Sequence, residues 1–183
     1  MAKVAYLREE IPVPENVNVE VRGKTVKVSG PKGVLERDFS HANNVIIKID
    51  NGKIVFETFF ANRRQKAVFY SVLSHVKNMI TGVLKGWRYK LRVVTTHFPA
   101  TVKIVGNEVV IDNFLGERHP RKAKILEGVN VRLEGRDVIV VEGIDREKVA
   151  QTAANIELAT RVKDKDRRIF VDGVYIYESG VAE

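Results

Sequence analysis

Cysteine is absent from the sequence, so disulfide bonds, thiolate metal ligands and cysteine nucleophiles are all excluded. Nothing marks the chain for an oxidising compartment, and an intracellular protein is the simpler expectation. Long hydrophobic runs are also missing. The first ten residues contain no apolar segment of the kind found in signal peptides, and no later stretch approaches the roughly 18 apolar residues of a membrane helix. We therefore expect neither export by that route nor a membrane partner.

Acidic residues are in the minority: 23 Asp and Glu stand against 31 Lys and Arg, which gives a net charge of +8 and an isoelectric point near 9.7. This balance favours polyanionic partners over acidic small molecules and neutral proteins. Charge alone does not decide, because many soluble proteins are mildly basic. With 183 residues, 44% of them hydrophobic, the chain can build one ordinary domain or two small ones.

The residue clusters that catalysis and metal binding need are missing as well. The four histidines are scattered along the chain without a metal-spaced pair: His41, His75, His97 and His119. Carboxylates are interleaved with cations, and no Gly-x-Ser-x-Gly elbow occurs. Residues 30–33, Gly-Pro-Lys-Gly, lack a following Gly-Lys-Ser/Thr and are predicted to form a turn. We predict no catalytic residue, no metal, no cofactor and no small-molecule substrate.

An internal repeat is present. Residues 17–33 align with residues 100–116 without a gap, and apolar residues alternate with period two on both sides of a glycine in each copy. That pattern predicts a β-hairpin. Each half then gives a second predicted hairpin, at residues 45–56 around Asn51-Gly52 and at residues 129–140 around Gly135. Asn-Gly is a strong turn signal because both residues tolerate positive φ.

Each half also ends with one predicted helix. In the first, the apolar residues follow the three-four spacing of one helical face: Val68, Val72, Val76, Ile80 and Val83. In the second, Val149, Ala153 and Ile156 continue such a stripe, with Asp145 as the N-cap. We therefore predict an α+β protein of two tandem duplicated domains, residues 1–85 and 86–183. Each domain is an antiparallel β-sheet with one helix packed across it.

Residues 85–92, KGWRYKLR, combine four cations with two aromatic residues and no anion. This favours RNA, because cations can meet phosphates while aromatic or guanidinium planes stack on unpaired bases. The alternative is a strand with Trp87, Tyr89 and Leu91 directed inward and its cations merely solvated. Both can hold, since alternate residues of a strand point to opposite sides. The candidates from this stretch are Arg88, Lys90 and Arg92.

Two further basic stretches lie in the second half. Residues 161–168, RVKDKDRR, hold five cations, and Gly173 soon after them predicts a turn at which backbone can approach a phosphate closely. Residues 113–122 hold three cations and one anion. A solvated charged segment and a polar hairpin end are the respective alternatives. The candidates are Lys163, Lys165, Arg118, Arg121 and Lys122.

Five separated stretches together resemble one known family, at residues 14–17, 23–39 (GKTVKVSGPKGVLERDF), 74–92 (SHVKNMITGVLKGWRYKLR), 113–118 (NFLGER) and 166–180 (DRRIFVDGVYIYESG). This is the universal large-subunit ribosomal protein six family, in its archaeal or eukaryotic form. The five stretches follow one another in the same order as in the family, and together they extend over nearly the whole chain. Departures from the family pattern are Ser179, where a basic residue is common, and Glu157, at a helix position often held by glutamine.

The resemblance implies a structural, non-enzymatic role in the large ribosomal subunit of the cytoplasm. Its partners would be large-subunit rRNA, near the factor-binding region and the sarcin-ricin loop, and neighbouring large-subunit proteins. The second domain would supply the principal rRNA contacts, although net charge is higher in the first half. The family's C-terminal signature carries over onto Arg167, Arg168, Phe170, Asp172, Gly173 and Tyr175.

Two rival functions remain at this stage. A freestanding protein-interaction module built from duplicated β-rich domains would bind a protein partner with little dependence on salt. An enzyme acting on an anionic substrate is disfavoured by the lack of a convergent acid, base or metal cluster. The leading hypothesis is an rRNA-binding scaffold that neutralises phosphates and fixes the positions of RNA helices.

Overall fold

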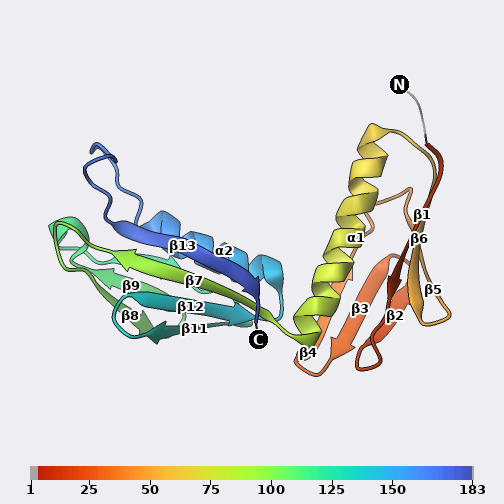
Figure 1. The fold of residues 1–183 in the computed structure, drawn as a ribbon, viewed down its shortest axis with the longest axis horizontal. Helices are drawn as coiled ribbons and strands as arrows, with labels where there is room; N and C mark the ends of the chain where they lie inside the picture. The colour runs from red at the N-terminus through yellow and green to blue at the C-terminus, as the bar shows by residue number, and fades with distance from the viewer. Residues whose placement is uncertain (1–3, 183) are drawn as a thin grey trace. The chain divides into compact units, whose positions relative to one another are not determined.

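The computed structural model describes residues 4–182, and the chain divides into two compact units between Lys85 and Gly86 (Figure 1). The first unit has a hydrophobic core of buried residues that runs from Ile11 to Val83 in the sequence. The core of the second unit runs from Trp87 to Val174. The two cores share no residue, so each unit has the apolar interior that an independent fold needs.

Within residues 4–85, unit 1 has one helix and six strands, all paired antiparallel. One sheet has the order β1-β6-β5, with β1 at Val4–Pro12, β6 at Lys53–Ala61 and β5 at Ile46–Asp50. The other has the order β2-β3-β4, with β2 at Asn18–Arg22, β3 at Thr25–Gly30 and β4 at Gly33–Asp38. Helix α1, Arg63–Leu84, packs on both through its buried apolar stripe.

Helix α1 begins where the chain supplies its own cap. The side chain of Asn62 accepts a hydrogen bond from the backbone of Gln65, and the Gln65 side chain accepts one from the backbone of Asn62 in return. This capping box satisfies two of the amides that a helix start leaves unpaired. The helix ends at Lys85, whose amide donates to Thr81.

Unit 2 has seven strands, one α-helix and one short 3-10 turn, η1, at Phe114–Gly116. A four-stranded sheet has the order β11-β12-β7-β13, at Val129–Glu134, Val138–Gly143, Trp87–Val94 and Gly173–Val181 respectively. A three-stranded sheet has the order β10-β9-β8, at Arg121–Lys124, Glu108–Asp112 and Thr101–Val105. Helix α2, Arg146–Ala159, lies across the sheets (Figure 1), with Asp145 as its N-cap as predicted.

The duplicated hairpins of the sequence are β2-β3 and β8-β9. Both turn at a glycine in the left-handed region, Gly23 at φ 63° and Gly106 at φ 58°. In the β5-β6 hairpin, Asn51 and Gly52 both have positive φ, as the Asn-Gly signal predicts. The α+β prediction, with two tandem copies of an antiparallel sheet and a helix, is confirmed.

Basic residues 88, 90 and 92 belong to β7, which is a central strand between β12 and β13. Trp87 and Leu91 are buried in the core of unit 2, and the alternation expected of a strand places the cations on the opposite face. The turn expected at Gly173 is wrong. Gly173 is the buried first residue of β13, and a Cβ there would come within 2.9 Å of the Tyr175 ring.

Two glycines allow the helices to pack closely against the sheets. A Cβ on Gly30, at the end of β3, would lie 2.7 Å from Val83 Cγ2 in α1. A Cβ on Gly143, at the end of β12, would lie 2.8 Å from Val149 Cγ2 in α2. Such distances are too short for a methyl group without displacement of the helix, so each position requires glycine for packing.

We expect Gly30→Ala and Gly143→Ala each to lower the free energy of unfolding of its own unit by about 1 to 3 kcal/mol, through overpacking. In differential scanning calorimetry the first substitution should move only the transition of unit 1, and the second only that of unit 2, because the cores share no residue. Gly180→Ala is the matched control, since a Cβ there meets nothing within 4 Å. A single transition that moves with both substitutions would contradict independent unfolding.

Candidate nucleic-acid interface

Three loops of unit 2 meet at the end of the sheet where β7 stops and β13 starts (Figure 1). They are residues 95–100, 113–120 and 160–172, and we call them together the loop end of unit 2. Asn113 Nδ2 donates to the Pro99 carbonyl over 2.9 Å, which joins the first loop to the second. Asp172 joins the first loop to the third. Seven of the fourteen predicted rRNA-binding residues lie in these loops, and the others lie on strands β7, β10 and β13.

Asp172 accepts four hydrogen bonds. Its Oδ1 accepts from the backbone amides of Thr96 (2.6 Å) and His97 (3.0 Å), and its Oδ2 accepts from Thr96 Oγ1 at 2.8 Å and lies 2.6 Å from His97 Nδ1. Burial alone would raise the pKa of this carboxyl, but the donors of His97 and Thr96 outweigh it and hold the pKa well below its usual range. The carboxylate is 2% exposed, so it is placed to hold the loops together.

The aromatic members of the predicted site also contact residues of the loop end. The ring of Phe170 stacks on His97 with centroids 4.5 Å apart, and Lys165 Nζ lies 4.8 Å from the Phe170 centroid. Tyr175 donates its hydroxyl hydrogen bond to the carbonyl of Val171 over 3.0 Å. These contacts order the segment that precedes β13 and fix the direction of the side chains it presents.

Arg121 donates its hydrogen bonds to other groups of the protein. Its Nε and Nη2 donate to the carboxylate of Glu117, and its Nη1 donates to the carbonyls of Ala159 (3.0 Å), the last residue of α2, and of Arg161 (2.9 Å) just beyond it. The guanidinium also lies over the ring of Phe114. A cation that satisfies the last carbonyls of a helix stabilises that end, so Arg121 ties β10 to α2.

Four more predicted cations form ion pairs. Arg88 pairs with Glu142, Lys90 with Glu178, Lys122 with Glu108 and Arg168 with Asp166, at N to O distances of 2.5, 3.0, 3.2 and 2.8 Å. Exposed pairs of this kind contribute only about 0 to 1 kcal/mol, so a phosphate can replace the carboxylate at little cost. Arg88 is the least available of the four, because its side chain and that of Glu142 are both partly buried.

The remaining cations at or beside the loop end are exposed and have no carboxylate partner among residues 4–182: Arg92, Arg118, Lys163, Lys165 and Arg167. Arg161 belongs with them, although the sequence analysis did not single it out. Exposed apolar side chains lie among these cations in the sequence, namely Phe98, Ile169 and Val171. Unpaired cations beside apolar groups suit a ligand that presents both phosphates and bases.

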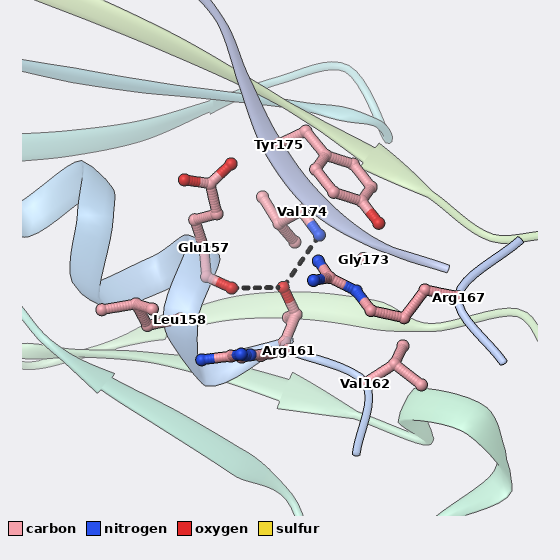
Figure 2. A pocket seen from close by; sticks show the side chains of 9 residues that line it. Glu157, Leu158, Arg161, Val162, Arg167, Gly173, Val174 and Tyr175 are labelled. Carbon is pink, nitrogen blue, oxygen red and sulfur yellow. Dashed lines mark hydrogen bonds between the residues drawn. The ribbon is translucent and has the colours of Figure 1, made fainter. Parts of the chain in front are cut away.

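A pocket of about 390 Å³ opens beside this basic surface, between the end of α2 and the start of β13 (Figure 2). Arg161, Arg167 and Glu157 are among the residues that line it. Thr160 is buried at its base, where Oγ1 donates to the Glu157 carbonyl and accepts from the amide of Val174. No sequence pattern predicted this pocket, because its walls come from segments that fold together only in three dimensions.

Residues 4–182 contain no group of three or more His, Asp or Glu side chains placed to hold a metal ion. No helix within these residues is long and apolar enough to cross a membrane.

The family model and the similar known proteins point to the same family. The model of the family described as ribosomal protein L6 matches twice, at residues 13–86 and 98–173, one match in each unit. The chain is similar to proteins named large ribosomal subunit protein uL6 from three archaea. It is 58% identical over 181 residues to that of Ignicoccus hospitalis, covering 97% of both chains. The identity is 57% for Saccharolobus solfataricus, with 99% of both chains covered, and 58% for Staphylothermus marinus, with 100% covered.

Replacing Asp172 by Ala should lower the free energy of unfolding of unit 2 by about 1.5 to 3 kcal/mol, because the donors of Thr96 and His97 lose a charged, buried acceptor. Hydrogen exchange at the amides of Thr96 and His97 should accelerate, which reports loss of this contact directly. Since folding lowers the pKa of Asp172, its stabilisation is present above the ordinary pKa near 4 and is lost as the pH falls below that value. The stability difference between wild type and variant should therefore shrink with acid, and a constant difference would contradict the role.

Proposed function

The chain belongs to the ribosomal protein L6 family, and we propose that it is a structural, non-enzymatic component of the large ribosomal subunit that binds rRNA through the loop end of unit 2. The proteins it resembles carry large-subunit names, and they match it over nearly their full length. Such a protein catalyses no reaction; it neutralises phosphates and holds RNA segments in position. Its location is then the ribosome in the cytoplasm.

The observation that carries the proposal is the set of exposed, unpaired cations at the loop end. Lys163 and Lys165 lie on one loop with Arg167, and none of the three has a carboxylate partner among the described residues. RNA backbone supplies the missing negative charges, and release of the condensed counterions makes that association favourable. Phosphate contacts of this kind position a protein on RNA and carry little sequence information.

The proposal assigns the principal rRNA contacts to unit 2, residues 86–183. Unit 1 has the greater net charge, but local arrangement matters more than net charge for contacts at one surface. In unit 2 the loops that carry the cations are held by Asp172, Arg121 and the stack of Phe170 on His97. Loops ordered before binding lose less conformational entropy when RNA arrives.

We further propose that the chain lies near the factor-binding region and the sarcin-ricin loop of large-subunit rRNA, with other large-subunit proteins as neighbours. This finer placement rests on the family resemblance alone. A footprint on rRNA tests it without any assumption about individual residues.

Affinity for a large-subunit rRNA fragment should fall steeply with salt, by about 0.7 to 0.9 in log-log slope for each phosphate neutralised. Lys163→Ala with Lys165→Ala should reduce that slope by roughly 1 to 2, as expected for two lost phosphate contacts. The matched control is Arg63→Ala with Arg64→Ala, which removes equal charge from the start of α1 in unit 1. Filter binding or fluorescence anisotropy at several salt concentrations measures both. Equal losses for the two double variants would show that net charge governs binding.

In cell extract the protein should sediment with the large subunit in a sucrose gradient after a high-salt wash. Hydroxyl-radical footprinting of subunits with and without the protein should then show protection near the sarcin-ricin loop. A purely soluble distribution would contradict the ribosomal role itself. Protection confined to a different part of the rRNA would leave that role in place and refute the proposed position.

A further inference from the structure

The pocket beside β13 has a size and a lining that phosphate binding alone does not require. Ligand sites occupy about 300 to 1,000 Å³, and a volume of about 390 Å³ lies near the lower end of that range. One nucleotide is a suitable occupant, whereas an RNA helix can only cover the opening. The pocket is lined from three segments: the last turn of α2, the stretch that follows it, and the start of β13 (Figure 2).

The two guanidinium groups of the pocket are available to a ligand. Neither Arg161 nor Arg167 donates a side-chain hydrogen bond to any of the described residues, and both side chains belong to exposed residues. Figure 2 shows Arg167 reaching from its loop towards the backbone of Gly173 and Val174. A guanidinium offers a planar fork of donors to a phosphate and a flat face to a base.

The carboxylate of Glu157 distinguishes this pocket from a simple anion site. It lines the pocket, and its Oε1 accepts from the amide of Ile176 over a long 3.3 Å. It forms no ion pair with a cation of the described residues. A carboxylate that has no ion-pair partner repels a phosphate but accepts hydrogen bonds from the amino and imino groups of a base. Cations and a carboxylate in one pocket match a ligand with both a phosphate and an N–H edge.

The remaining walls are apolar and held in place. Leu158 is exposed beside the opening, and Val162 is buried against the core. The Tyr175 ring is 37% exposed and is fixed by the bond from its hydroxyl to Val171. Thr160 links α2 to β13 beneath the pocket. A rigid, partly apolar wall with an exposed aromatic ring can receive the face of a base at little entropic cost.

We propose that this pocket binds a single unstacked nucleotide of the rRNA, with its phosphate on Arg161 and Arg167 and the N–H edge of its base on Glu157. The inference rests on the proposed rRNA-binding function and adds to it a base-specific contact. Among the four bases, guanine presents neighbouring imino and amino donors to one carboxylate, so it is the favoured occupant.

The probes are the four nucleoside 5′-monophosphates, ribose 5-phosphate and inorganic phosphate, each titrated into the isotope-labelled full chain at constant ionic strength. In two-dimensional NMR spectra, amide signals of Leu158, Val174 and Tyr175 should shift saturably. The guanosine nucleotide should bind at least about fivefold more tightly than ribose 5-phosphate, since base stacking alone is worth about that much. A saturable effect that requires the base distinguishes a nucleotide pocket from a phosphate site.

Adjacent arginines provide the matched pair of variants. Arg167→Ala should weaken nucleotide binding by about tenfold, as expected for loss of one charged hydrogen-bonding group, whereas Arg168→Ala should change it less than twofold, because Arg168 pairs with Asp166 and does not line the pocket. Glu157→Gln keeps an acceptor for Ile176 but adds N–H donors. It should weaken the guanosine nucleotide and leave the uridine nucleotide nearly unchanged.

The outcomes separate the inference from the proposed function. Equal affinities for ribose 5-phosphate and all four nucleotides would refute the base contact, and so would the absence of saturable shifts at millimolar nucleotide while an rRNA fragment still binds. Equal effects of the two arginine variants would refute the assignment to this pocket. Failure of the wild-type chain to bind any large-subunit rRNA fragment would refute the proposed function itself.

Discussion

One buried carboxylate organises the surface on which the proposed function depends. Asp172 joins residues that are 75 and 76 positions apart in the chain, because it accepts from His97 and Thr96. With that contact in place, Phe170 stacks on His97 and β13 starts at Gly173, beside β7. The cations on the preceding loop then project from a fixed backbone. An acidic residue thereby supports a basic surface, because its hydrogen bonds hold together the loops that carry the cations.

Much of the fold could be predicted from the sequence, because its hairpins and helices are local. Alternation around Gly23 and Gly106, the Asn51-Gly52 turn and the cap at Asp145 each involve neighbouring residues, and the structure has all of them. The partners of β1 and β13 were not predictable in this way. Both strands pair with segments that are distant in the sequence, β1 with β6 and β13 with β7. A local sequence pattern does not identify such distant partners.

In the candidate site too, the residue types could be predicted from the sequence, but their tertiary contacts could not. Composition identifies a cation but not what it contacts, so Arg121 and Lys163 looked equivalent as members of basic stretches. In the structure Arg121 is bound to the end of α2, while Lys163 is exposed. Arg167 and Arg168 are neighbours in sequence, yet one lines a pocket and the other pairs with Asp166. Tertiary contacts decide which of these cations are paired and which are exposed, so no local pattern could separate them or identify Arg161 and Glu157 as pocket residues.

The central place of β7 in its sheet also determines how late unit 2 can complete its fold during synthesis. Unit 1 is complete once α1 has left the ribosomal tunnel, and N-terminal domains generally fold first on the nascent chain. In unit 2, β7 is made first of the strands and β13 last, so one edge of β7 stays unpaired until nearly the whole unit has emerged. Unpaired edges invite aggregation. The nascent chain thus carries a vulnerable strand edge from the synthesis of β7 until that of β13, and only a chain that includes β13 can complete the surface proposed to bind rRNA.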